Sequence, residues 1–118
     1  FAMLANGGTL AGTRILNAAT VGTFTDRRPE SDRDDDVQGI PVQIGAGFWL
    51  AGNTQPGNLG RLIGTDPTAF GHPGAGCSIG WAQPKQRLAV AILHNRMVQP
   101  PALSQDPLRA AVTAAFGG

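Results

Sequence analysis

The segment from Gly71 to Gly80 contains the side chains with the clearest capacity for chemistry. It reads Gly-His-Pro-Gly-Ala-Gly-Cys-Ser-Ile-Gly, which places a histidine, a cysteine and a serine among small residues. A histidine can change its charge near neutral pH and can act as an acid, a base or a hydrogen-bond partner. Taken alone, His72 is better explained as a structural histidine at the start of a strand.

The same segment also contains a Gly-x-Ser-x-Gly pattern, with Ser78 at its centre. In α/β-hydrolases this pattern forms a sharp strand-to-helix turn that presents the serine as a nucleophile. Here Trp-Ala-Gln-Pro-Lys follows, which predicts a strand and a turn, so Ser78 is not expected to be the nucleophile. Cys77 is expected to be a small buried residue, with a reactive thiol as the alternative.

No metal ion or other cofactor is predicted. His72, Cys77 and His94 have no short ligand spacing, and no carboxylate lies among them. Alternating aspartates occur within residues 26–36, but the central glycine and the closing glutamate of a calcium loop are not at the required positions. Since residues 26–36 contain no apolar side chain, they predict an exposed charged loop.

Two helices are predicted in the first part of the chain. Phe1–Asn6 contains good helix formers and ends in Asn-Gly-Gly, so we expect the last turns of a helix whose start lies upstream. Asn17 can cap a second helix that runs to about Phe24, with Val21 and Phe24 on one face.

Strands are predicted in the region from Val37 onwards. Val42–Leu50 and Phe70–Ala82 each predict one extended segment, and Leu88–Leu93 is a continuous apolar run typical of a buried central strand. A turn centred between Pro84 and Lys85 would join the last two strands as an antiparallel hairpin. That register would place Ala75 opposite His94.

A final helix is predicted after Ser104, with Leu108, Val112 and Ala115 along one face. The fold class is therefore α+β, an antiparallel sheet with packed helices. No linker interrupts residues 1–118, so we expect one structural unit.

Composition limits the classes of partner. The 118 residues carry 14% charged side chains and a net charge of +1, which does not suggest nucleic acid binding. The longest apolar stretches are far shorter than the roughly 20 residues of a membrane helix, so no membrane span is predicted. No signal peptide is visible, and the compartment cannot be predicted.

Residues Phe70–Met97 resemble the active-site strand and the following strand of β-lactamase-related serine hydrolases, in particular the class C and esterase branch. That family carries a Lys-Thr-Gly or His-x-Gly triplet on the strand that borders its active site, and His72–Gly74 stands here as His-Pro-Gly. A Gly-rich stretch, an aromatic residue, a turn with proline and an apolar strand follow in the same order. Looser similarity covers Met3–Gly8, Arg14–Asn17 and Val37–Leu50.

The resemblance implies the C-terminal part of the β-lactamase and penicillin-binding-protein-like fold. It also implies an acyl-enzyme mechanism on a small ester or amide substrate. By the family's pattern, Ala75 supplies a backbone N–H to the oxyanion, and Gly74 leaves space for the substrate carbonyl. His72 would then lie beside the nucleophile as a hydrogen-bonding or electrostatic partner.

The family's Ser-x-x-Lys nucleophile motif is absent from this chain. None of its three serines has a lysine three residues further on, and the Tyr-x-Asn motif cannot occur because tyrosine is lacking. We therefore expect the nucleophile upstream of Phe1 and predict that this chain alone is inactive. Exposed apolar faces should then lead it to pack against the missing N-terminal part of the domain or to self-associate.

Two alternatives stay open at this point. The chain could be a non-catalytic remnant or binding domain that keeps the fold. It could also belong to a β-lactamase or penicillin-binding relative, although the His-Pro-Gly triplet in place of Lys-Thr-Gly mildly favours esters.

Overall fold

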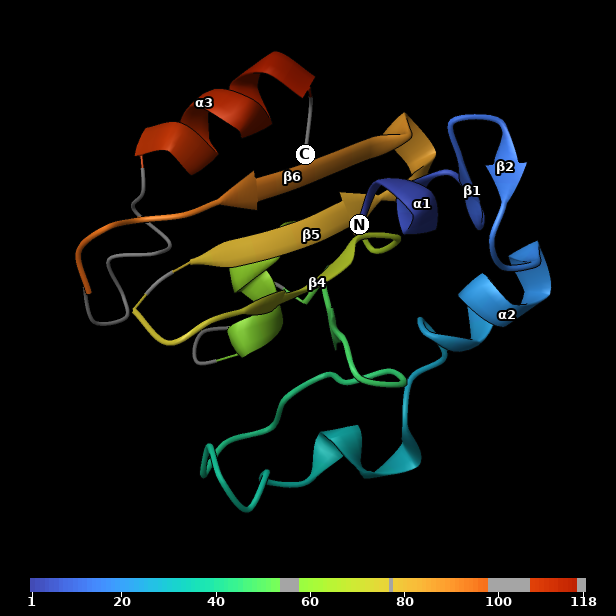
Figure 1. The fold of residues 1–118 in the computed structure, drawn as a ribbon. Helices are drawn as coiled ribbons and strands as arrows, with labels where there is room; N and C mark the ends of the chain where they lie inside the picture. The colour runs from blue at the N-terminus through green and yellow to red at the C-terminus, as the bar shows by residue number, and fades with distance from the viewer. Residues whose placement is uncertain (54–57, 77, 98–106, 117–118) are drawn as a thin grey trace.

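A four-stranded antiparallel sheet forms the centre of the computed structural model, which describes residues 1–53, 58–76, 78–97 and 107–116 (Figure 1). The strand order is β3-β4-β5-β6. The strands are β3 (Trp49–Leu50), β4 (Phe70–Pro73), β5 (Ile79–Gln83) and β6 (Leu88–Ile92). The other elements are α1 (Ala2–Ala5), β1 (Thr9–Leu10), β2 (Thr13–Arg14), α2 (Ala18–Thr23), α3 (Pro107–Phe116) and the short 3₁₀ turns Pro29–Asp32, Leu59–Leu62 and Pro84–Gln86. This arrangement confirms the predicted α+β class.

Each face of the sheet packs against its own hydrophobic cluster. On one face, Phe70 and Ala82 pack with Leu4 and Ala5 of α1 and with Val21 of α2. On the opposite face lies the second cluster, which consists of Val42, Trp49, Ala51, Leu62, Ile63, Ala69, Ile79, Trp81 and Ile92, with Val112 of α3 packed against it. The sheet is therefore covered by α1 and α2 on one side and by α3 and the 3₁₀ turn Leu59–Leu62 on the other.

The two predicted N-terminal helices are confirmed. α1 ends at Asn6, and the next residue, Gly7, has the positive φ of +59° that a left-handed helix end requires. α2 begins after Asn17, whose side-chain oxygen accepts a hydrogen bond of 2.7 Å from the Thr20 amide. The hairpin of β1 and β2 between them was not predicted.

The prediction of one strand over Val42–Leu50 is wrong. The chain folds back on itself within this range, so that Ile44 bridges to Trp49 and only Trp49–Leu50 joins the main sheet. Gly45 and Gly47 make this reversal possible. A side chain at Gly45 would meet the Phe24 carbonyl oxygen at 2.0 Å, and Gly47 has a φ of +90°.

The prediction of one extended segment over Phe70–Ala82 is also wrong, because these residues form the β4–β5 hairpin. His72 pairs with Gly80, and Pro73 pairs with Ile79. A loop rich in small residues reverses the chain, with Gly76 at a φ of +83°.

The β5–β6 hairpin is confirmed, but with a different register. The prediction would pair Ile79 with Val90, whereas Ile79 pairs with Ile92. The turn is longer than predicted because the 3₁₀ turn Pro84–Gln86 is followed by Arg87 in the left-handed region, at a φ of +51°. A shift by two residues leaves every side chain on its predicted face.

The strand β6 lies at the end of the strand order, so it is not the central strand that its apolar run suggested.

The predicted C-terminal helix is present as α3, although its proposed cap, Ser104, lies outside the described residues. Val112 packs on the core, whereas Leu108 is 56% exposed, so only part of the predicted apolar face is buried. None of the described helices is long and apolar enough to cross a membrane.

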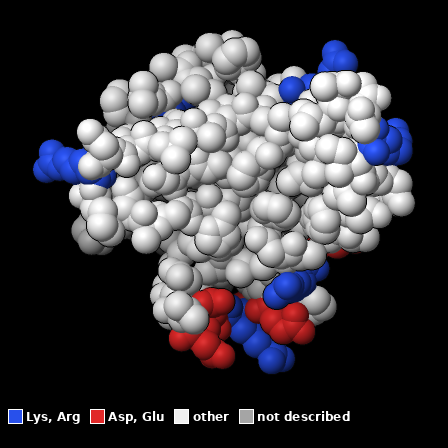
Figure 2. Space-filling model, viewed as in Figure 1, with Lys and Arg blue, Asp and Glu red and all other residues white. Residues whose placement is uncertain are grey.

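The charged run at residues 26–36 is largely exposed, as predicted, and Figure 2 shows acidic and basic side chains gathered at the end of the molecule that it forms. It is nevertheless anchored. Ser31 is buried, and its hydroxyl accepts from the Ile44 amide and donates to the Ile44 carbonyl, both at 3.2 Å. These two hydrogen bonds attach the loop to the segment that leads into β3.

Gly71 lies between two tryptophans in adjacent strands, paired with Trp49 of β3 and with Trp81 of β5. A Cβ atom here would come within 2.2 Å of the Gly80 carbonyl oxygen and 2.6 Å of the Trp81 Cβ. Because both neighbours belong to the packed sheet, neither can move away cheaply.

We predict that Gly71→Ala lowers the free energy of unfolding by about 2–3 kcal/mol. The matched control is Gly22→Ala in α2, where an added Cβ meets nothing within 4 Å. That change should instead stabilise the protein by about 0.4–1 kcal/mol. Urea unfolding of the protein that contains residues 1–118 measures the free energy of unfolding of both variants. Equal stabilities of the two variants would contradict the packing described for Gly71.

Asp66 joins the loop before β4 to the turn between β5 and β6. Its carboxylate accepts hydrogen bonds of 2.8 Å from the amide and from the hydroxyl of Thr68. Burial alone would raise the pKa of Asp66. The hydrogen bonds from Thr68 and Gln86 and the charge of Lys85 outweigh it, so the pKa lies below its ordinary value of 3.8.

We predict that Asp66 stabilises the fold at neutral pH and that this contribution is lost in acid. Since the folded pKa is below the ordinary value of 3.8, the stabilisation is complete well above that pH and declines as the pH falls through it. The difference in unfolding free energy between wild type and Asp66→Asn should therefore shrink as the pH falls below about 4. Thr68→Ala, which removes one hydroxyl donor, should show part of the same loss. A difference independent of pH would contradict this role.

Candidate active site

The predicted site residues lie where β4 leaves the sheet. The strand β3 pairs only with Phe70 and Gly71, so His72 and the residues after it have a neighbouring strand on the β5 side alone, within the described residues. Gly74 donates a hydrogen bond of 2.6 Å to the Ser78 carbonyl oxygen, which closes the loop on that side. The other side of this segment is an open edge.

Ala75 lies in the turn that follows this edge and is exposed. No hydrogen-bond acceptor for its amide is found among the described residues. An exposed N–H beside small residues is available to a substrate oxygen, which is the chemistry that an oxyanion donor requires.

His72 is exposed and is held by two contacts. Its Nδ1 lies 2.5 Å from the Pro73 carbonyl oxygen. Its ring lies against the indole of Trp49, with ring centroids 5.4 Å apart and planes inclined by 56°. Among the described residues, no hydrogen-bond partner is found for the opposite ring nitrogen, Nε2.

A shallow apolar cavity of about 270 Å³ adjoins this edge. His72, Gly80 and Ala91 are paired across β4, β5 and β6, so they form one row of its lining. Gly80 and Ala91 carry no large side chains, and the Phe1 ring lies over Gly80, 2.6 Å from the place that a Cβ would take. Gly74, Ser78, Ile79, Ile92 and Leu93 complete the lining.

The other chemically interesting residues of the sequence are not arranged as a nucleophilic site. Ser78 lies in the loop immediately before β5, so a strand follows it and not the helix of a nucleophile elbow. His94 lies after the end of β6 and does not line the cavity. Cys77 lies outside the described residues.

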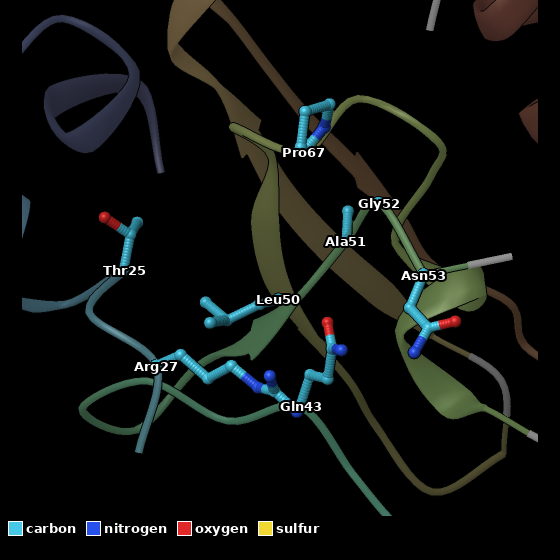
Figure 3. Close-up of a pocket in the computed structure, with 8 residues that line it drawn as sticks. All are labelled: Thr25, Arg27, Gln43, Leu50, Ala51, Gly52, Asn53 and Pro67. Carbon is cyan, nitrogen blue, oxygen red and sulfur yellow. The ribbon is translucent and has the colours of Figure 1, made fainter. Parts of the chain in front are cut away.

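A second cavity, of about 560 Å³, lies at the opposite end of β3 and β4 (Figure 3). The side chains of Arg27 and Gln43 lie side by side at its rim, and Arg27 forms an ion pair with Asp32. The lining contains no histidine, cysteine, serine or carboxylate; it consists of Thr25, Arg27, Gln43, Leu50, Ala51, Gly52, Asn53 and Pro67. It therefore offers less to acyl-transfer chemistry than the edge of β4.

Sequence reasoning did not identify Trp49 as a neighbour of His72. The two residues are brought together by the pairing of Trp49 with Gly71, which depends on the reversal of the chain at Gly45–Phe48. An aromatic residue in a glycine-rich segment was the available signal, but the wrongly predicted single strand concealed its partner.

The comparison with protein families agrees with this geometry. The family model described as Beta-lactamase matches residues 1–115. The chain belongs to the β-lactamase family. Among curated relatives, it is 32% identical over 100 residues to the esterase/β-lactamase LipL of Mycobacterium tuberculosis, which covers 85% of the chain and 21% of LipL.

Two solved structures are similar to the chain. A family VIII carboxylesterase matches 98% of the chain and 28% of its own length, with a TM-score of 0.76 and 36% identity. A penicillin-binding protein homolog from Caulobacter crescentus matches 81% of the chain and 24% of its own length, with a TM-score of 0.64 and 30% identity. The chain thus spans between a fifth and a third of the length of these relatives, and the similarity confirms the predicted β-lactamase and penicillin-binding-protein-like fold.

Proposed function

We propose that this chain forms one wall of the active site of a serine esterase that acts through an acyl-enzyme. The observation that carries the proposal is the open edge of β4, where the His72 ring and the exposed Ala75 amide adjoin the same small-residue loop. The similarity to a family VIII carboxylesterase over 98% of the chain supports ester substrates.

The reaction would begin with attack of a serine hydroxyl on the ester carbonyl carbon, which turns the carbonyl oxygen into an oxyanion. The Ala75 N–H donates to that oxyanion, and Gly74 leaves room for it. Collapse of the intermediate breaks the bond to the alcohol, which leaves with a proton, and water then releases the acid from the serine. His72 is the partner that accepts or returns a proton beside the nucleophile.

The serine itself is proposed to come from outside residues 1–118. Ser31 and Ser78, the two serines within the described residues, have no lysine three residues further on, and Ser31 is buried and bonded to Ile44. The relatives are several times longer than this chain and leave room for a Ser-x-x-Lys motif elsewhere.

Hydrolysis of a β-lactam amide is the second candidate. LipL is described as an esterase and a β-lactamase, and one similar structure is a penicillin-binding protein homolog. Both substrates would use the same oxyanion donor, so parallel assays with a p-nitrophenyl ester and a chromogenic cephalosporin separate them.

We predict that His72→Ala lowers kcat/KM for the p-nitrophenyl ester by about 10²–10⁴ in the natural protein, because the site loses its proton-transfer partner. His94→Ala is the matched control, since it removes the other histidine of this chain. It lies outside the cavity and should leave kcat/KM within about twofold.

Unchanged activity of a folded His72→Ala variant would contradict the proposed role of this edge. Absence of both esterase and β-lactamase activity in the natural protein would favour the alternative of a non-catalytic domain that keeps the fold.

A further inference from the structure

The contact between the rings of Trp49 and His72 can fix the orientation of the imidazole. Trp49 is only 9% exposed, whereas His72 is exposed. The indole belongs to the core cluster on one face of the sheet, and its ring centroid lies 5.4 Å from that of the imidazole. A fixed ring thus lies against the exposed imidazole and restricts its rotation.

The position of Trp49 is fixed from two directions. Its backbone pairs with Gly71 on one side and bridges to Ile44 on the other. Gly71 has no room for a side chain, because a Cβ would meet atoms of Gly80 and Trp81. The indole itself is buried in the core cluster, and this packing leaves it little freedom to move away from His72.

The second contact of His72 determines which ring nitrogen carries the proton. A carbonyl oxygen can only accept a hydrogen bond, so Nδ1, at 2.5 Å from the Pro73 oxygen, must be the donor. In the neutral ring, Nε2 then holds the lone pair and is able to accept a proton. The hydrogen bond selects the tautomer, and the indole restricts the rotation of the ring.

We propose that Trp49 is a positioning residue. Together with the Pro73 carbonyl, it holds His72 in the tautomer whose Nε2 lone pair can accept a proton. The inference rests on the proposed function of His72. It assigns Trp49 no contact with the substrate, since the indole acts through the imidazole.

The first test compares Trp49→Phe with Trp49→Leu in the natural protein. Phenylalanine keeps an aromatic ring against His72, so kcat should stay within about threefold, whereas leucine should lower kcat by about ten- to a hundredfold with KM nearly unchanged. Trp81→Leu is the matched control, since Trp81 is 2% exposed, belongs to the same cluster and also pairs with Gly71. Its kcat should remain close to that of wild type. An equal loss in Trp81→Leu and Trp49→Leu would show a general effect of destabilisation and overturn the proposal.

The second test needs no activity and applies even if the leucine variants do not fold. Nitrogen-15 NMR of the His72 ring, assigned with His72→Gln, should show the proton on Nδ1 in wild type and in Trp49→Phe. A ring protonated mainly on Nε2 would overturn the proposal.

Two substitutions of His72, made with Trp49 intact, test whether Nε2 is the ring nitrogen that takes part in the reaction. The side-chain amide of glutamine reaches the position of Nε2, whereas that of asparagine reaches only that of Nδ1. His72→Gln should therefore keep at least about tenfold more kcat/KM than His72→Asn. The opposite order would contradict the assignment of Nε2. If His72→Ala leaves activity unchanged, the proposed function fails, and the NMR result still decides whether the Pro73 carbonyl fixes the tautomer of the ring.

Discussion

The absence of a side chain at Gly71 is the constraint on which the rest of this structure depends. It lets Trp49 and Trp81 flank the same position of β4, and a single added carbon would collide with the Gly80 carbonyl and with Trp81. The two indoles help to hold three strands together through one core cluster. The residue that follows Gly71 is His72, so this close packing adjoins the histidine of the candidate site.

Local signals predicted the local structure well. Asn17 caps α2 as expected, and the Asn-Gly end of α1 carries a left-handed glycine, because both features depend on a few neighbouring residues. The strands were harder to predict. Glycine in an apolar segment is compatible with a strand or with a reversal, and the choice at Gly45 is made by a distant atom, the Phe24 carbonyl oxygen. The register of the last hairpin depended in the same way on Arg87 adopting a left-handed conformation, which no residue-type preference indicated.

The candidate site could be recognised only in part from the sequence. The His-Pro-Gly triplet drew attention to this segment, because small residues beside a histidine are visible in one stretch of chain. The open edge of β4 was not visible, since it arises where the two-residue strand β3 ends. The support of His72 by Trp49 also arises from pairing between separate segments. The sequence thus pointed to His72, whereas its contact with Trp49 could be seen only in the fold.

The central claim is that this chain supplies the oxyanion side of a serine hydrolase whose nucleophile is contributed by another segment. Labelling of the natural protein with a fluorophosphonate, followed by mass spectrometry of its peptides, tests this claim most directly. We expect the label on a serine of a Ser-x-x-Lys motif outside residues 1–118. A label on Ser78, the serine next to the site in this chain, would contradict the account.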